Sequence, residues 1–324
     1  MNVLVTGGCG YVGSALLPHL QASEEVDRLI VLDDLSTGTP RNLFGLDVAD
    51  GFAFRSGDVR NYGDVENAVR DADAVIHLAA ITGAASTHDR PEETRAVNYE
   101  GTKNVLTAAE KFGIGNVVFA SSCNSYGRAA SEDIDESVEP APINPYAETK
   151  HDSESLLREF VSSTGADATA LRMSTNYGLA PGIRFNLVVN HFVFRALTGR
   201  PLTVYGDGSN WRPFIHVRDA ARAFAHAALS PERWSHLVYN VGSNDENYRI
   251  AEVARVVRDE IDADLDVTYL QDEHPGPSYH INFDRLAETG FETRYTLPRG
   301  VRELAEAFSE SRKGTLEGKG MIEP

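Results

Sequence analysis

The chain has 324 residues, 42% of them hydrophobic, which is enough to bury the core of one large domain or two coupled ones. Its formal net charge of −18 argues against a nucleic-acid partner, because nucleic-acid binding needs Lys and Arg against phosphate. No run approaches about 18 consecutive apolar residues, and no basic segment precedes an apolar one at the N-terminus. We therefore expect no membrane span, no signal peptide and a cytoplasmic protein.

Short apolar runs alternate with helical patterns through the first half of the chain. The runs predict strands at 3–6, 28–33, 74–78, 117–121 and 168–173, and the patterns between them predict helices at 11–21, 65–70, 94–112 and 147–162. This alternation is typical of a doubly wound parallel sheet with helices on both faces, an α/β Rossmann fold.

The pattern changes after about residue 173. Helices are predicted at 187–197, 218–229 and 250–261, a strand at 237–241, and Gly- and Pro-rich turns at 199–208. We interpret this part as a smaller, irregular C-terminal cap. The predicted division is a Rossmann domain at 1–172, to which 212–229 returns, a cap at 173–211 and 230–311, and a polar tail at 312–324 with a frayed end.

The first predicted strand leads through a glycine-rich turn into a helix. Gly7, Gly10 and Gly13 have the spacing that a dinucleotide-binding turn needs, with helix amides facing the pyrophosphate. Asp33 ends the second strand, where a carboxylate accepts hydrogen bonds from the adenosine ribose and repels a 2′-phosphate. The alternative is an ordinary turn followed by a surface Asp. The combination favours an NAD site, and we expect no metal.

Two later strand ends fit the same cofactor. Asp58 follows a strand-like run and is a candidate acceptor for the adenine amino group. The run 77–80 ends a strand with small residues, as backbone lying against a dinucleotide requires. Taken alone, each has an ordinary structural explanation.

Tyr146 and Lys150 stand four residues apart at the start of a predicted helix, so their side chains share one face. The neighbouring ammonium, together with a positive nicotinamide, is expected to lower the pKa of the phenol and make Tyr146 a general acid/base. Ser122 ends the preceding strand and is placed to hydrogen-bond the same substrate hydroxyl. A Tyr–Lys pair by itself is more often a surface pair. Here the glycine turn, Asp33 and Ser122 precede it in this order, and the combination favours a catalytic pair.

In combination, these motifs resemble the extended short-chain dehydrogenases/reductases, specifically the NAD-dependent epimerase/dehydratase family that includes UDP-galactose 4-epimerase. The resemblance covers roughly residues 1–310. Its matching stretches are 5–13, 32–35, 57–60, 75–80, 97–98, 121–127, 145–150 and 212–219.

The resemblance implies a set of site residues and a reaction. The residues that it places around NAD are Gly7, Gly10, Tyr11, Val12, Gly13, Asp33, Asp34, Asp58, Val59, Leu78, Ala79, Ala80, Asn98, Tyr146 and Lys150. It implies that a sugar carbon, usually C4, gives hydride to NAD while Tyr146 takes the hydroxyl proton and Lys150 holds the nicotinamide ribose. In an epimerase the ketone turns over and takes the hydride back on its other face. The family also implies a nucleotide-sugar substrate and a homodimer that pairs helices 94–112 and 147–162.

The substrate-binding positions depart from the family pattern. Arg212 matches the arginine that binds the substrate diphosphate, with a cap-surface arginine as the alternative. Thr175 stands where many members have a substrate-binding Asn, and the adjacent Asn176 is a candidate replacement. The second diphosphate arginine is absent or replaced by His274 or His280. A nucleotide other than UDP, or a sugar without a nucleotide, therefore stays open.

Three functions remain open: a nucleotide-sugar 4-epimerase, another enzyme on the same scaffold, and an idle NAD-binding protein. The second group comprises a ketoreductase, a dehydrogenase and a C3/C5 epimerase. The retained Ser122, Tyr146 and Lys150 argue against the idle protein. Family members that eliminate water across C5 and C6 carry an Asp-Glu pair after the catalytic Ser or Thr, whereas this chain has Cys123 and Asn124. We expect no 4,6-dehydratase activity, and Cys123 is either a small packing residue or an acid/base for C3 or C5.

Overall fold

The computed structural model describes residues 1–48, 51–128, 133–261, 265–271 and 276–319. Within these ranges, no helix has both the length and the apolar character needed to cross a membrane.

The centre of the molecule is a parallel sheet of seven strands in the order β3-β2-β1-β4-β5-β6-β10. The strands are β1 (Asn2–Thr6), β2 (Arg28–Asp33), β3 (Phe52–Ser56), β4 (Ala74–His77), β5 (Asn116–Ser122), β6 (Asp167–Met173) and β10 (Val238–Val241). This strand order reverses between β1 and β4, as it does in doubly wound dinucleotide-binding folds. The predicted fold is confirmed.

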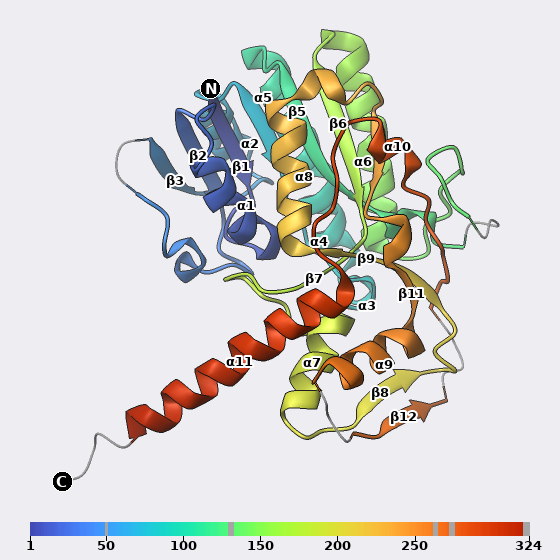
Figure 1. Cartoon of the computed structure of the whole chain (residues 1–324). Helices are drawn as coiled ribbons and strands as arrows, with labels where there is room; N and C mark the ends of the chain where they lie inside the picture. Colours follow the sequence, from blue (N-terminus) through green and yellow to red (C-terminus); the bar gives the residue numbers. More distant parts are fainter. Residues whose placement is uncertain (49–50, 129–132, 262–264, 272–275, 320–324) are drawn as a thin grey trace.

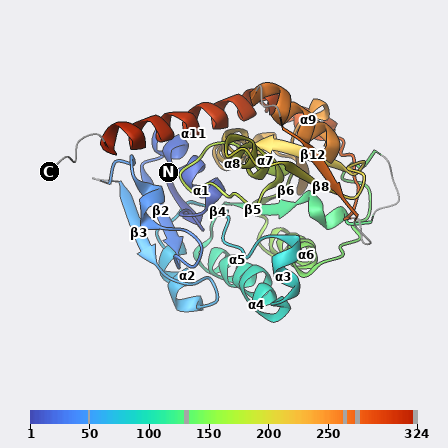
Figure 2. The same cartoon turned by 90° about the horizontal axis from the view of Figure 1, so that it is seen from below.

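Helices cover both faces of this sheet (Figure 2). Helices α1 (Tyr11–Gln21) and α8 (Val217–Leu229) pack on one face, and α2 (Tyr62–Val69), α5 (Gly101–Phe112) and α6 (Pro145–Thr164) pack on the other. Successive strand residues point to opposite faces, so Val3 and Val5 join the core under α1 and α8, while Leu4 joins the core under α2 and α5. Burial on both faces explains why these strands read as continuous apolar runs.

The cap lies beyond the sheet, at the lower end of the molecule in Figure 1. It contains two small sheets, β11-β9-β7 and β12-β8, packed with α7, α9 and the start of α11 around a separate apolar core. Its elements are β7 (Thr175–Tyr177), α7 (Val188–Leu197), β8 (Leu202–Tyr205), β9 (Trp211–His216), β11 (Asn247–Arg249), α9 (Ile250–Ile261), β12 (Val267–Leu270) and α11 (Leu297–Lys319).

Three parts of the sequence prediction are wrong in detail. The prediction assigns the range 230–311 to the cap, but β10 within it pairs in parallel with β6 and forms one edge of the main sheet. The polar end of the chain continues α11 as far as Lys319, and residues 320–324 lie outside the described ranges. The rest of the domain division stays a prediction.

The third difference is the predicted helix over 94–112, which the structure divides. Helix α4 (Pro91–Arg95) is followed by a π-helical turn at Ala96–Glu100 and then by α5. Within that turn, Asn98 is fully buried and exchanges two hydrogen bonds with the backbone of Ile81. The widened turn therefore places Asn98 against the loop that follows β4. Two further short helices, α3 (Ala84–His88) and α10 (Asp284–Ala287), were not predicted.

Candidate active site

A cavity of about 600 Å³ opens at the carboxyl ends of the sheet strands. This is the edge at which doubly wound sheets bind their ligands. Of the predicted site residues, those that line the cavity are Gly7, Gly10, Tyr11, Val12, Gly13, Asp33, Asp34, Val59, Leu78, Ala79, Ala80, Ser122, Tyr146, Lys150, Thr175 and Asn176. The cavity thus brings the predicted cofactor loops and the predicted catalytic set together.

The glycine turn has the shape of a cradle for a dinucleotide. Gly7 has φ +71°, and a Cβ there would lie 2.7 Å from the Ala79 nitrogen. A Cβ at Gly13 would lie 2.5 Å from the Gly8 oxygen, so close packing of helix α1 on the turn excludes larger residues. Gly10 caps α1 without a side-chain hydrogen bond, which leaves the first helix amides for a phosphate. These features fit the pyrophosphate of NAD.

Asp33 is held in place at the end of β2 and is 7% exposed. Its carboxylate accepts hydrogen bonds from the backbone N–H groups of Cys9 at 2.9 Å and Leu35 at 2.8 Å. Burial nevertheless raises its pKa above the usual range. Arg60 also lines the cavity, but its guanidinium pairs with Asp58 at 2.5 Å. The Arg60 guanidinium is therefore engaged by Asp58 and is not free to pair with a 2′-phosphate.

We expect the enzyme to bind NAD more tightly than NADP. A 2′-phosphate beside Asp33 would be repelled by the like charge of the carboxylate, which would also lose its hydrogen bonds to the ribose. Together these effects should make NADP bind about 10- to 100-fold more weakly than NAD. Calorimetry of both cofactors measures this ratio. Asp33→Asn removes the charge and should narrow the preference, and equal affinities in the unchanged protein would contradict the assigned role.

Two predicted cofactor residues lie outside the cavity lining. Both carboxylate oxygens of Asp58 bind Arg60, through its backbone N–H at 2.8 Å and its guanidinium. Asn98 bonds Ile81 and donates to the Thr149 hydroxyl at 3.1 Å. Asn98 therefore positions the loop after β4 against α6, and adenine recognition by Asp58 stays a prediction.

The capping of helix α6 sets the positions of the two catalytic candidates that it carries. Asn144 accepts a hydrogen bond from the Ala147 N–H at 2.9 Å, and Pro145 occupies the first helical position. Tyr146 thus falls in the first turn and Lys150 one turn later, both facing the cavity. Ser122, at the end of β5, hydrogen-bonds the Tyr146 phenol.

The pKa values of this pair differ from the prediction. Burial raises the pKa of Tyr146, and the bond from Ser122 and the positive charge of Arg184 only partly offset this effect. Lys150 is 2% exposed, its ammonium lies 4.7 Å from the centre of the Phe119 ring, and burial lowers its pKa to about 7. For the protein's own side chains, the predicted lowering of the Tyr146 pKa by Lys150 is wrong.

A buried ion pair, with a hydrogen bond from a serine, joins β5, β6 and α6. Arg172 donates from Nε and Nη2 to the two carboxylate oxygens of Glu154, at 2.9 and 2.6 Å. The Ser121 hydroxyl donates to the same carboxylate at 2.6 Å. Because Ser121 precedes Ser122, and Glu154 lies one turn beyond Lys150, this pair fixes strand β5 relative to helix α6. No sequence motif predicts this ion pair.

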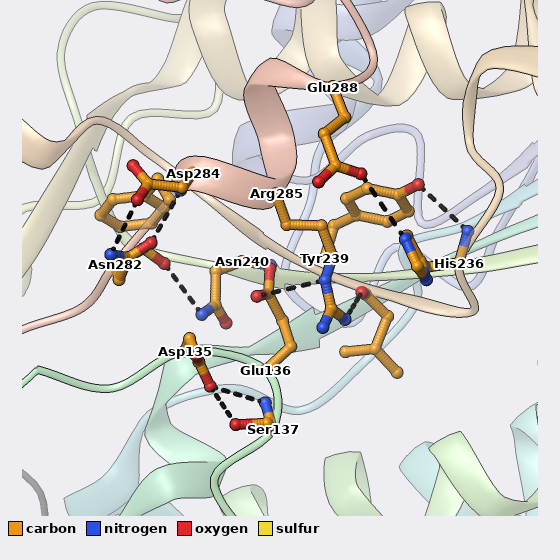
Figure 3. A network of polar contacts seen from close by, with 12 residues as sticks. Asp135, Glu136, Ser137, His236, Tyr239, Asn240, Asn282, Asp284, Arg285 and Glu288 are labelled. Atoms are coloured by element: carbon orange, nitrogen blue, oxygen red, sulfur yellow. Dashed lines mark hydrogen bonds and ion pairs between the residues drawn. The ribbon is translucent and has the colours of Figure 1, made fainter.

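A second polar network joins Glu136 to β10 and α10 (Figure 3). Glu136 accepts a hydrogen bond from the Asn240 backbone N–H at 2.7 Å and pairs with Arg285 at 3.5 Å. Asn240 also accepts a hydrogen bond from the Tyr126 hydroxyl at 2.8 Å. Burial raises the pKa of Glu136. Asn240 on β10 therefore contacts both Tyr126 and Glu136, and Arg285 on α10 contacts Glu136.

The substrate side of the site agrees only in part with the prediction. Thr175 and Asn176 line the cavity, and the buried Oδ1 of Asn176 has no hydrogen-bond partner among the described residues. Arg212 does not line it, because its guanidinium lies over the Tyr279 ring at 4.8 Å and donates to the carbonyl oxygens of Trp211 and Pro277. His280 pairs with Asp133 at 3.5 Å, and His274 lies outside the described residues.

Arg184 also lines the cavity, although it was not among the predicted site residues. It lies in the loop between β7 and α7, and its Nη1 donates to the Thr82 hydroxyl across the cavity. No motif marks this loop, so only the fold shows that it approaches Tyr146.

A family model described as the NAD dependent epimerase/dehydratase family matches residues 3–242. The chain belongs to this family. It is an enzyme, and its cofactor is NAD.

Relatives of this family member carry out different reactions. The low-salt glycan biosynthesis protein Agl12 of Haloferax volcanii is 27% identical over 95% of this chain and 98% of the relative. A dTDP-glucose 4,6-dehydratase of Streptomyces niveus is 28% identical over 96% of this chain and 94% of the relative. A solved UDP-N-acetylglucosamine 4-epimerase from Methanobrevibacter ruminantium M1, in complex with UDP-N-acetylmuramic acid, is 28% identical with a TM-score of 0.86, covering 96% of this chain and 98% of the other.

Proposed function

We propose that this family member is a nucleotide-sugar 4-epimerase. The observation that carries the proposal is the distribution of carboxylates around the cavity. The described lining residues include only three, Asp33, Asp34 and Glu93. Asp33 ends β2 and Asp34 follows it, at the predicted cofactor end of the cavity, and Glu93 pairs with Arg90. None of them stands beside Tyr146, so the described lining residues offer no carboxyl group there to protonate a departing C6 hydroxyl or to take the C5 proton.

The side chains present are sufficient for oxidation and reduction at one carbon. Bound NAD supplies a reversible hydride acceptor. Tyr146 takes the proton of the C4 hydroxyl and returns it after the ketone has turned, while Ser122 stabilises the phenolate through its hydrogen bond. Lys150 would hold the nicotinamide ribose. Asn176 supplies an unpaired carbonyl oxygen for a sugar hydroxyl.

Cys123 does not support chemistry at C3 or C5. Its thiol is 1% exposed, donates to the Arg172 carbonyl oxygen at 3.1 Å and packs against Tyr126 and Tyr279. Burial raises its pKa far above the ordinary range of a thiol. Such a group neither gives nor takes a proton readily at neutral pH, so we assign it to packing.

Product analysis tests the proposed reaction. UDP-, dTDP-, GDP-, CDP- and ADP-hexoses are incubated with the enzyme as purified, without added cofactor, and the products are identified by NMR. We expect one of them to give an equilibrium mixture of C4 epimers. A 4-keto-6-deoxy product, or a product formed only in proportion to added NAD, would contradict the proposal.

The homodimer and the cytoplasmic location remain proposals. The large exposed apolar side chains of the described residues are Phe44, Val48, Phe54, Phe185, Phe194, Tyr205, Tyr269 and Leu270. None lies on α5 or α6, the helices through which the family resemblance implies pairing. A dimer formed there would bury a polar face.

A further inference from the structure

Hydrogen bonds fix the backbone around Arg184 close to helix α1, which follows the glycine turn. Its carbonyl oxygen accepts a hydrogen bond from Asn190 Nδ2 at 3.0 Å, and Asn190 is fully buried. Two residues before it, the Gly182 N–H donates to the Ser14 hydroxyl on α1 at 3.0 Å. The position of this side chain is therefore set by the fold.

The guanidinium of Arg184 contacts neutral groups only. Nη1 donates to the Thr82 hydroxyl, and Nε donates to Asn186 Oδ1 at 3.3 Å. A guanidinium carries five N–H donors, so several remain for a ligand in the cavity that Arg184 lines. Within the ranges that the structure describes, no carboxylate pairs with Arg184.

The other arginines of the cavity lining are neutralised by the protein. Arg60 pairs with Asp58 at 2.5 Å, and Arg90 pairs with Glu93 at 3.8 Å. Arg184 is partly buried and lacks such a partner, in a chain whose net charge is −18. A desolvated charge without a counter-ion is costly, so we expect the ligand to supply the anion.

The place of Arg184 in the cavity identifies which part of a ligand this anion belongs to. Thr82 follows the small-residue end of β4, whereas Asp33, which would bind the adenosine ribose, ends β2 on the other side of β1. The charge of Arg184 also acts on the Tyr146 phenol, whose pKa it lowers. An anion at Arg184 therefore lies beside the group that reacts with the sugar.

We propose that Arg184 binds a carboxylate on the sugar itself, which makes nucleotide-linked acidic sugars the preferred substrates. This inference rests on the proposed function. A carboxylate matches the planar fork of a guanidinium and forms charge-assisted hydrogen bonds that a neutral hexose cannot form. A neutral sugar would leave the Arg184 charge unpaired, and this cost adds to the preference for an acidic sugar over a neutral one.

A matched pair of ligands tests the proposal on the holoenzyme. Calorimetry compares UDP-glucuronate with UDP-glucose, which differ only in the carboxylate at C6, and includes UDP and NAD as further probes. We expect UDP-glucuronate to bind the wild-type enzyme more tightly. Arg184→Gln should weaken UDP-glucuronate about 10- to 100-fold and leave UDP-glucose, UDP and NAD unchanged. Arg184→Lys should recover part of the loss, and Arg28→Gln, an exposed control, should change nothing.

Each other outcome contradicts the carboxylate assignment. An equal loss for UDP-glucuronate, UDP-glucose and UDP would place Arg184 on the substrate diphosphate, and weaker NAD binding would place it on the cofactor. If Arg184→Gln shifted the pH profile of turnover and left all affinities unchanged, Arg184 would act only on the pKa of Tyr146 and would bind no anion. Failure of UDP-glucuronate to bind, or tighter binding of UDP-glucose, also overturns it. If UDP-glucose is nevertheless epimerised, the proposed function stands; if no nucleotide sugar is turned over, the proposed function fails as well.

Discussion

Tyr146→Phe is expected to retain the fold and NAD binding and to lose turnover by about 10²- to 10⁴-fold, the usual contribution of a general acid/base. The substitution removes one hydroxyl that hydrogen-bonds Ser122 and leaves the aromatic ring in the first turn of α6. Turnover at saturating substrate and calorimetry with NAD measure the two effects separately.

Tyr205→Phe is the matched control for this variant. Tyr205 is 67% exposed on β8 and does not line the cavity, so loss of its hydroxyl should leave turnover unchanged. Wild-type turnover in Tyr146→Phe would contradict the proposed role of Tyr146 in proton transfer.

Lys150→Met is expected to abolish most turnover and yet to stabilise the cofactor-free protein. Burial lowers the pKa of Lys150 from 10.5 to about 7, so the folded state disfavours the ammonium. Below pH 7 both states carry the charge and the folded state bears its full desolvation cost. Between pH 7 and 10.5 the folded lysine is neutral while the unfolded one is charged, so wild-type stability rises with pH. The cost is at most roughly 5 kcal/mol.

Denaturant unfolding at several pH values checks this second prediction. The gain in the free energy of unfolding of Lys150→Met over wild type should be largest at pH 6 and should shrink as the pH approaches 10. Lys103→Met, on the exposed face of α5, should show no such pH-dependent gain. A destabilised Lys150→Met, or a gain that is constant with pH, would contradict the burial of a costly charge.

The sequence predicted the elements whose patterns are long and continuous. Helix α1 and strand β2 begin and end where predicted, because a strand buried on both faces leaves a continuous apolar run and a helix with one buried face leaves a periodic pattern. Strands β7 and β11 have three residues each and were missed, since tertiary pairing with β9, and not a local pattern, defines them. The π-helical turn was missed because it depends on the contact between Asn98 and Ile81.

The candidate site shows the same division. The glycine turn, Asp33, Ser122 and the Tyr146–Lys150 pair were predictable because each depends on spacing along one strand or helix. Arg212 was placed by position in a motif, but its side chain turns to Tyr279 instead of lining the cavity. Arg184 comes from a loop without a motif, so its role depends on contacts that span 102 residues of the chain. The pKa of Tyr146 depends on burial, which spacing does not reveal.

The fate of the hydrogen at C4 tests the central claim most directly. A substrate labelled with deuterium at C4 is converted in ordinary water by the enzyme as purified, and the position of the label is read by NMR. The account predicts that the label is retained at C4 of the epimer, because Tyr146 moves only the hydroxyl proton and no described carboxylate near it promotes elimination. Deuterium at C6 of a 4-keto-6-deoxy sugar, or its loss from the sugar, would contradict the account.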